Sequence, residues 1–418
     1  MVQMAKSVLQ DRLRKSGASA FLQSARDNAI LLSKIWGTSN SQLDASRIVK
    51  QIPHTREAVF NRLGLNPSII SQVCCKKCFA LNPYPLEKDE SLCPKSCQQP
   101  FLSFYQTYCK WAKENKVTPL CNQELLKPNQ KNRLKPFRTF SYITLESWLQ
   151  ARLSDSQFET LLDSSLTAEH GRPDQPMADI WDGTVWNEFP ETEDGGGIFT
   201  KTSGNLVFSL YLDWFNAEGT SSRGSHNSIG SITLICLNLP PAKRYKIENI
   251  FVFGVIPGPR EPSLEQINHV MLPLVSELQS FWKGVRFPST ALHPGGRVIR
   301  AVIFPLIGDL PALRKTAGFG SHSATLFCSF CLMDKKEIEE IDPEKFPPRS
   351  NDQHLVYAKE WLALDSHKER KNLMREHSAR WSVLNHLPYW RPVEYCSIEL
   401  MHSLILIGDL KDQSIGFL

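Results

Sequence analysis

The sequence lacks long apolar runs. No stretch of eighteen or more uncharged apolar residues occurs, so no transmembrane helix and no membrane partner are expected. The first residues, 1–6, also lack the apolar core of a secretory signal peptide, which makes a disulfide framework unexpected. A Gly-x-Ser-x-Gly element is missing as well, and this argues against an α/β-hydrolase.

A strong excess of charge of one sign is also missing. The 48 Lys and Arg residues nearly balance the 43 Asp and Glu residues, which leaves a net charge of +5. This balance is compatible with nucleic acid as a partner but does not by itself indicate one. With 418 residues, of which 41% are hydrophobic, the chain can form two or three globular domains.

Cysteine is present in an uneven distribution, because seven of the eleven cysteines lie between residues 74 and 121. Cys75-x-x-Cys78 has the paired spacing of a zinc ribbon or knuckle, in which four thiolates hold a structural Zn²⁺. Cys93 and Cys97 are the expected further ligands, with Cys109 and Cys121 competing with Cys97 for the fourth place and Cys74 as the alternative to Cys75. Unrelated buried cysteines are the simpler explanation, but the density of cysteines in this window favours a metal site.

A second pair, Cys328-x-x-Cys331, has three interpretations. It is half of a second zinc site, a redox pair, or two small buried residues. The histidines that could complete a metal site are His322, His354, His367, His377 and His402, and the sequence does not select among them.

The pattern of apolar residues changes to strands from residue 205 onward. Strands are predicted at 205–213, 230–238 and 249–256, then an amphipathic helix at 263–283 and a strand at 297–309. Three sequential strands with short links pair antiparallel, and a helical crossover returns the next strand beside the first in parallel. This order predicts an α/β, ribonuclease-H-like core. Residues 137–168, in contrast, are predicted to be helical.

Two aspartates end two of these strands. Asp213 follows the first strand and Asp309 follows the last. Asp commonly ends a strand or caps a helix, and that is the simplest interpretation. In a ribonuclease-H-like core, however, these two positions carry carboxylates that share divalent cations for phosphodiester cleavage. The sequence therefore predicts that Asp213 and Asp309 are catalytic and bind Mg²⁺ or Mn²⁺.

Two further sets of residues are candidates near this site. Glu399 and His402 lie three residues apart on a predicted helix, where they either bind metal or orient a phosphate, or form an ordinary surface salt bridge or capping pair. Arg314 and Lys315 follow Asp309 and are candidates for contact with a DNA phosphate, although two basic residues in a loop are often only solvated.

Taken together, these motifs resemble those of CACTA (En/Spm)-type DNA transposases and of the fungal genes derived from such transposons. The resemblance runs from about Cys75 to the end of the chain. Its pieces are Cys75-Lys-Lys-Cys78, Asp179-Ile-Trp-Asp182, Leu212-Asp-Trp-Phe-Asn216, Ser225-His-Asn-Ser228, Leu237-Asn-Leu-Pro240, Pro257-Gly-Pro259, Gly308-Asp-Leu-Pro311, Lys315-Thr-Ala-Gly-Phe319, Cys328-Ser-Phe-Cys331, Leu387-Pro-Tyr-Trp390 and Met401-His402.

The resemblance implies a DDE-type core that cleaves DNA at transposon ends and joins strands with Mg²⁺ or Mn²⁺, and it implies a structural Zn²⁺. Transposon-end DNA and further copies of the chain are the implied partners, and the nucleus is the implied location. Glu399 stands where the family usually has Asp. The family's third acid lies beyond this motif, so the resemblance implies a truncated transposase, either a fragment or a degenerate copy, that is inactive or incomplete. The alternative is a non-catalytic zinc module that binds DNA or protein.

Five segments are expected along the chain. They are a polar, helical segment at 1–70, a zinc-ribbon-like module at 71–125, a helical connector at 126–204, the ribonuclease-H-like core at 205–320, and a segment with the second cysteine pair and an inserted α-rich part at 321–418.

Overall fold

The computed structural model describes residues 20, 22–28, 30, 52, 55, 58, 68–85, 93–100, 120–167, 176–192, 195–216, 228–321 and 324–399. The chain divides into two compact units, Met1–Ser68 and Ile69–Leu418. In the first unit, residues 22–28 are helical. The second unit holds the sheets and all the candidate sites.

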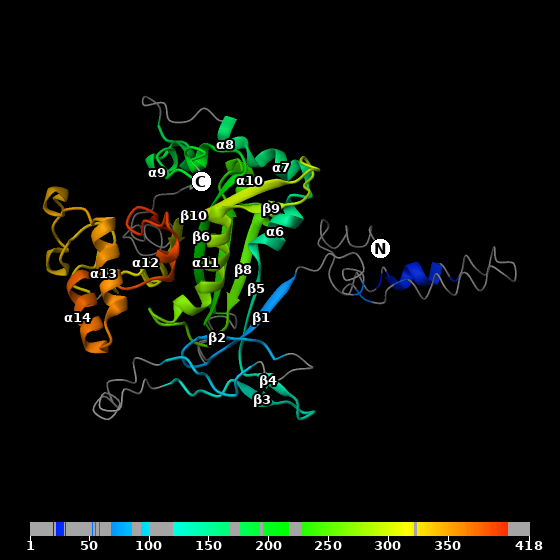
Figure 1. Cartoon of the computed structure of the whole chain (residues 1–418), viewed down its shortest axis with the longest axis horizontal. Coiled ribbons are helices and arrows are strands. Elements are labelled where there is room, and N and C mark those ends of the chain that lie inside the picture. Colours follow the sequence, from blue (N-terminus) through cyan, green and yellow to red (C-terminus); the bar gives the residue numbers. More distant parts are fainter. Residues whose placement is uncertain are drawn as a thin grey trace, which may run out of the picture. The chain divides into compact units, whose positions relative to one another are not determined.

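One sheet organises the larger unit (Figure 1), and three parallel strands form one side of it. These are β6 (Asn205–Asn216), β10 (Arg297–Gly308) and β11 (Cys396–Ile398), with β10 in the middle. Next to β6, the strands β7 (Ser228–Cys236) and β8 (Ile250–Ile256) continue the sheet antiparallel. The predicted strands and their pairing, with the fourth strand parallel beside the first, are confirmed.

The sheet continues past β8 through strands from the N-terminal part of this unit. The order is β8, β5 (Thr139–Ile143), β1 (Ile69–Cys74) and β2 (Leu81–Asn82), all antiparallel. A short strand, β9 (Val285–Phe287), pairs antiparallel with the start of β10. A separate hairpin is formed by β3 (Leu126–Pro128) and β4 (Leu134–Pro136).

Helix α11 (Ile267–Lys283) makes the crossover between β8 and the β9–β10 pair, and it lies along the sheet (Figure 1). Its apolar residues recur three and four positions apart and are buried, which is why this segment is an amphipathic helix against the core. It ends at Gly284, whose φ of 105° disfavours a side chain; a Cβ there would lie 2.8 Å from Val298.

The prediction of helix throughout 137–168 is wrong at its start. Residues 139–143 form β5, because this stretch has β-branched and aromatic residues with Phe140 fully buried between neighbouring strands. The side chain of Thr144 then accepts a hydrogen bond from the backbone N–H of Ser147, which begins a helix. Three helices follow: α6 (Leu145–Arg152), α7 (Ser156–Leu162) and α8 (Ser164–Thr167).

The part of the chain between β10 and β11 is mostly helical. It begins with α12 (Leu310–Ala317) and includes the pair α13 (Asn351–Ala363) and α14 (His367–His377), which project beside the sheet (Figure 1). Two further short helices are α9 (Thr184–Asn187) and α10 (Pro241–Arg244). Among the described residues, no helix is long and apolar enough to cross a membrane.

The segment at 176–192 packs on the core through a buried ion pair. Arg244 Nη1 lies 2.7 Å from Asp179 Oδ1, and the two side chains are only 6% and 10% exposed. The Arg244 guanidinium also lies over the ring of Trp181, whose indole N–H donates to the carbonyl of Leu237 at 2.7 Å. The Asp-Ile-Trp-Asp motif therefore fixes this segment to the link between β7 and β8.

Helix α11 also holds the start of α6 through Glu277. The backbone N–H of Leu145 donates to Glu277 Oε2 at 2.7 Å. Burial raises the pKa of Glu277 to about 7, although the hydrogen bonds from the Leu145 and Glu146 backbone oppose the shift. A carboxyl whose pKa is higher in the folded state than in the unfolded state reduces stability once the pH exceeds its unfolded value of about 4.3.

We predict that Glu277→Gln stabilises the protein at pH 8, because glutamine keeps the acceptor but carries no charge to bury. The gain in the free energy of unfolding should be about 1–3 kcal/mol at pH 8 and should fall to a few tenths of a kcal/mol near pH 4, where the wild-type carboxyl is mostly protonated in both states. Urea unfolding at both pH values measures it. The exposed Glu339→Gln variant is the control, and a gain that does not depend on pH would contradict the assignment.

Candidate metal centre and carboxylate edge

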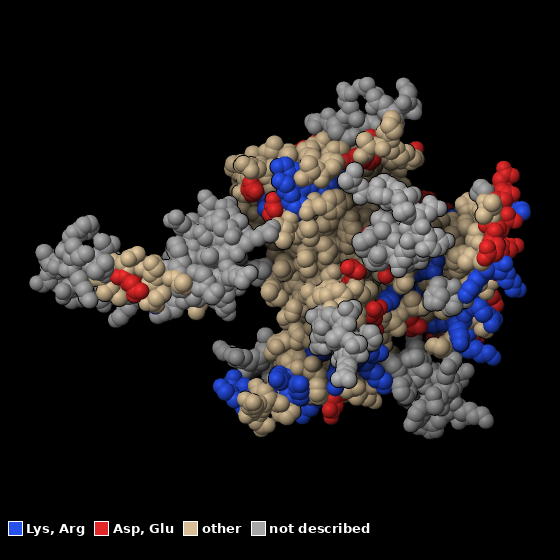
Figure 2. Space-filling view, turned by 180° about the vertical axis from the view of Figure 1, so that it is seen from behind, with Lys and Arg blue, Asp and Glu red and all other residues tan. Residues whose placement is uncertain are grey.

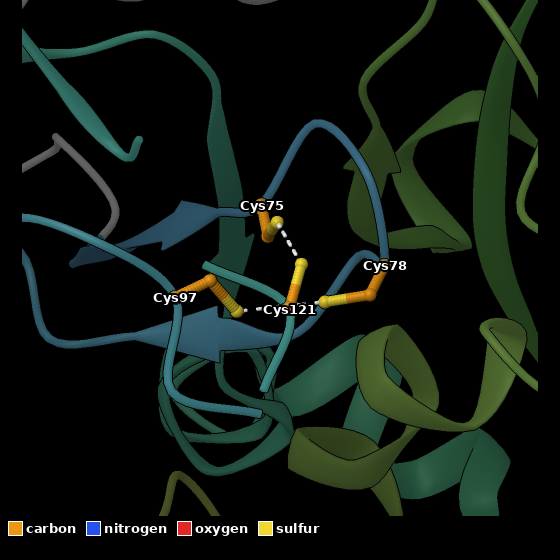
Figure 3. A group of neighbouring side chains, drawn as sticks. All are labelled: Cys75, Cys78, Cys97 and Cys121. Carbon is orange, nitrogen blue, oxygen red and sulfur yellow. Dashed lines mark hydrogen bonds between the residues drawn. The ribbon is translucent and has the colours of Figure 1, made fainter. Parts of the chain in front are cut away.

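Four cysteines from three segments of the chain converge at one end of the sheet (Figure 3). They are Cys75, Cys78, Cys97 and Cys121, and their sulfur atoms all lie within 4.8 Å of one another. The Sγ atoms of Cys75 and Cys121 are 3.7 Å apart, and those of Cys78 and Cys97 are 3.5 Å apart. All four side chains are buried.

This arrangement fits a tetrahedral zinc ion. With Zn–S bonds of about 2.3 Å, a tetrahedron places its sulfur atoms roughly 3.8 Å apart, close to the separations of 3.7 and 3.5 Å in these two pairs. Four thiolates around one ion leave no coordination position for water or substrate, which is the arrangement of a structural site. The cluster can therefore hold a metal such as zinc.

The first pair of cysteines lies on a tight turn that follows β1. The N–H of Cys75 donates to the carbonyl of Ala80 at 3.0 Å, and the N–H of Phe79 donates to the carbonyl of Cys75 at 3.1 Å. Phe79 has a φ of 65°, which reverses the chain after Cys78. The N–H of Lys77 points at Cys75 Sγ at 3.4 Å, as an N–H does toward a metal-bound thiolate.

Cys97 and Cys121 are brought together by antiparallel backbone pairing of the segments that carry them. The N–H of Cys97 donates to the carbonyl of Gln123, and the N–H of Asn122 donates to the carbonyl of Cys97, both at 2.9 Å. This pairing places Cys121 beside Cys97. Packed together, the thiols share protons: hydrogen bonds from Cys78 and Cys97 lower the pKa of Cys75, while the bond to Cys75 raises that of Cys78.

The other candidates in this window do not join the four sulfurs. Cys93 is buried in the same apolar cluster, and burial raises the pKa of its thiol, but it is not part of the group. The sulfur of Cys74 lies 3.8 Å from the carbonyl of Phe79. Cys109 lies outside the described residues. Sequence spacing could not separate these cysteines, because the choice depends on the pairing of residues 96–100 with 120–124.

Hydrogen bonds attach the turn that carries Cys75 and Cys78 to the core. Arg260 donates to the carbonyls of Lys76, at 2.9 Å, and Lys77, and Gln266 donates to the carbonyl of Lys77 at 3.0 Å. Arg138 lies over the ring of Phe79 at 3.9 Å and donates to the carbonyl of Cys75. The cysteine cluster is therefore joined directly to the core by these contacts.

The second pair, Cys328 and Cys331, has a similar local turn but a different environment. The N–H of Phe330 points at Cys328 Sγ at 3.4 Å, and both cysteines are half-buried. Arg349 donates to the carbonyl of Cys328 at 2.7 Å. Within the described ranges, no third His, Cys, Asp or Glu gathers with these two sulfurs.

The histidines proposed to complete that site are placed elsewhere or not described. His354 is buried against Phe319, with ring centroids 4.5 Å apart, and burial lowers its pKa to about 3. His377 stacks on Tyr357 at 3.7 Å, and His367 lies at the start of α14. His322 and His402 lie outside the described residues.

The candidate carboxylates lie on or just after three neighbouring parallel strands: Asp213 is near the end of β6, Asp309 follows β10 and Glu399 follows β11. In the register, Tyr211 pairs with Ile307, and Gly308 pairs with Ile398. Continuing this register sets Asp213 beside Asp309 and Asp309 beside Glu399, and the N–H of Glu399 donates to the carbonyl of Gly308 at 3.1 Å. Residues at the same register of neighbouring parallel strands leave the sheet on the same face. The three acids therefore form a row, here called the acid row, near the C-terminal ends of these strands.

Each aspartate is held by a local hydrogen bond. Asp309 Oδ1 accepts a hydrogen bond from the N–H of Ala312 at 2.8 Å, so Asp309 does cap α12, as the simplest interpretation of the sequence expected. Asp213 is exposed, and its Oδ1 accepts from its neighbour Trp214 at 2.8 Å. Both bonds leave Oδ2 as a possible ligand atom. Among the described residues, only the four cysteines bring three or more ligand atoms within 4.8 Å, so the acid row is more open than the cysteine cluster.

The two basic residues proposed for DNA contact are engaged in packing. Arg314 is 5% exposed, so contact with DNA would require this packing to open. Lys315 Nζ lies 2.7 Å from Glu261 Oε2 and 4.8 Å from the centre of the Trp214 ring. Lys315 therefore already has an acidic partner.

The chain belongs to the transposase family tnp2, whose family model matches residues 174–383. The matched range covers β6 to β10 and the inserted helices, and it includes both aspartates. The cysteine centre and Glu399 lie outside it. No curated protein matches the chain. Membership of a transposase family indicates DNA as a partner.

We predict that Cys121→Ser removes bound zinc and that Cys93→Ser does not, because only Cys121 lies in the group of four sulfurs. Metal analysis of purified protein should show one zinc ion fewer per chain in Cys121→Ser than in wild type. The melting temperature should fall by several degrees in the same variant and in wild type treated with a chelator. Full zinc retention in Cys121→Ser, with loss in Cys93→Ser, would contradict this ligand set.

Proposed function

We propose that this protein is a CACTA-type DNA transposase, in which a ribonuclease-H-like core cuts and joins DNA with divalent cations held by Asp213, Asp309 and Glu399. The strand order supports this proposal. Three antiparallel strands, β6 to β8, are followed by two parallel strands, β10 and β11, on the other side of β6. The row of three acids at the ends of β6, β10 and β11 is the observation that carries the proposal.

The row suits Mg²⁺ or Mn²⁺ because these ions prefer carboxylate oxygens. When bound, such ions activate the attacking water or hydroxyl and stabilise the leaving oxygen. The protein's part is to hold the ligands. The N–H of Ala312 fixes Asp309 at the start of α12, and the bond from Glu399 to Gly308 keeps Glu399 at the next strand. In this proposal Glu399 takes the place of the third acid, which the family resemblance placed beyond this motif.

The cysteine centre has a structural role in this proposal. Its four thiolates would leave bound zinc no open position, so it organises the chain that surrounds it. We further propose that the substrate is transposon-end DNA, that copies of the chain assemble on it, and that the protein acts in the nucleus. His402 remains a predicted catalytic residue.

We predict that the purified protein nicks DNA in the presence of Mg²⁺ or Mn²⁺ and that each of Asp213→Asn, Asp309→Asn and Glu399→Gln slows nicking by about 100-fold or more. A factor of 100 corresponds to about 2.7 kcal/mol of lost transition-state stabilisation. The readout is relaxation of a supercoiled plasmid, and the exposed Glu339→Gln variant is the matched control.

The pattern across these variants separates the possible outcomes. Nicking that persists in both aspartate variants would exclude the acid row as the active site. If Glu399→Gln alone nicks like wild type, the third acid lies elsewhere. If wild type binds DNA without nicking it, the chain is the non-catalytic zinc-containing module of the alternative hypothesis.

A further inference from the structure

The hairpin formed by β3 and β4 is rich in basic residues. Residues 125–138 contain five Lys and Arg residues and no Asp or Glu, although the whole chain is nearly neutral. Lys131, Arg133 and Lys135 are exposed, as are Gln130 and Asn132 at the tip. Within the described part of the chain, Lys131 and Lys135 have no ion-pair partner. Figure 2 shows Lys and Arg side chains gathered at the end of the molecule that carries this hairpin.

The tip of the hairpin is held in one conformation by Asn129. Its side-chain oxygen accepts hydrogen bonds from the N–H groups of Lys131, at 2.9 Å, and Arg133, at 3.0 Å. The N–H of Asn129 donates to the carbonyl of Arg133 at 2.8 Å, and Asn132 adopts a φ of 57°. The tip is therefore ordered before any partner binds, which reduces the entropy lost on binding.

The base of the hairpin is anchored at the cysteine centre. Leu125 is buried in the same apolar cluster as the four cysteines. Its N–H donates to the carbonyl of Lys95 at 3.0 Å, and its carbonyl accepts from the N–H of Phe137 at 2.9 Å. A two-stranded hairpin alone is at best marginally stable, so this anchor is what makes it a fixed projection. The metal centre thus sets the position of the basic tip.

The shape and composition of the hairpin favour duplex DNA over a protein strand. Each of its strands ends in a proline, Pro128 or Pro136, which limits pairing with a further strand. The major groove of B-form DNA, about 12 Å wide, admits a two-stranded ribbon, whereas A-form RNA has a deep, narrow one. Lys and Arg suit phosphates and guanine edges, and Asn and Gln suit adenine edges.

We propose that the β3–β4 hairpin is a DNA-recognition ribbon that enters the major groove of the substrate, with Lys131, Arg133 and Lys135 against the DNA. The inference rests on the proposed function, since it assumes that the chain binds DNA. It goes beyond the proposed function because it names the part of the chain that contacts DNA. This hairpin lies outside the range matched by the family model.

The test is the salt dependence of binding to a 30-base-pair mixed-sequence DNA duplex, measured by fluorescence anisotropy with the full chain. The variant combines Lys131→Gln, Arg133→Gln and Lys135→Gln. The control combines Lys368→Gln, Lys371→Gln and Arg375→Gln, which removes the same charge from the exposed face of α14. Zinc content and melting temperature verify that both variants fold. An RNA duplex of the same sequence is the second probe.

We predict that the hairpin variant binds DNA at least tenfold more weakly and that its slope of log affinity against log salt falls by roughly 2 to 3, about 0.9 per lost phosphate contact. The α14 control should stay within about threefold of wild type. The proposed role of the hairpin would be wrong if both variants lost DNA affinity equally or if the hairpin variant lost none. It would also be wrong if the wild-type chain bound the RNA duplex as tightly as the DNA duplex. A wild-type chain that binds no DNA would overturn the proposed function itself.

Discussion

The parallel pairing of β6, β10 and β11 is the constraint on which the rest of the molecule depends. The apolar residues of β6 and β10 are buried over long continuous runs, as is typical of strands covered on both faces. A shift of one residue in the register of either strand pair would move every side chain of one strand to the opposite face of the sheet. Asp309 would then no longer share a face with Asp213 and Glu399. The register that fills the core is thus the same register that aligns the acids.

The same sheet carries the metal centre. Strand β1 runs directly into Cys75, and β5, which pairs with β1, also joins β8 through Ser141 and Tyr142. The cysteine turn is held again by Arg260 and Gln266, which precede α11. Loss of zinc is therefore expected to loosen the hairpin and the sheet edge from β1 to β5, while the strands that carry the acids keep their own core.

Sequence reasoning succeeded where the signal was continuous. The runs at 205–213 and 297–309 are apolar enough to indicate buried strands, and the spacing of apolar residues in α11 is regular. It failed at β5, where apolar residues at helical spacing masked a five-residue strand. Strand β11 has only three residues, so nothing local marks it as a neighbour of β10. The position of Glu399 beside Asp309 could not be foreseen, because it depends on that distant pairing. The choice of Cys121 over Cys93 depends on such a pairing too.

The central claim is that acids on three neighbouring strands form one cation site. Calorimetric titration of Mn²⁺ into zinc-loaded protein tests it most directly, with wild type compared with Asp213→Asn, Asp309→Asn and Glu399→Gln. We expect saturable binding in wild type that is lost in both aspartate variants and weakened in Glu399→Gln. Binding that is unchanged in all three variants would mean that these residues only end strands and cap a helix, and the claim would be wrong.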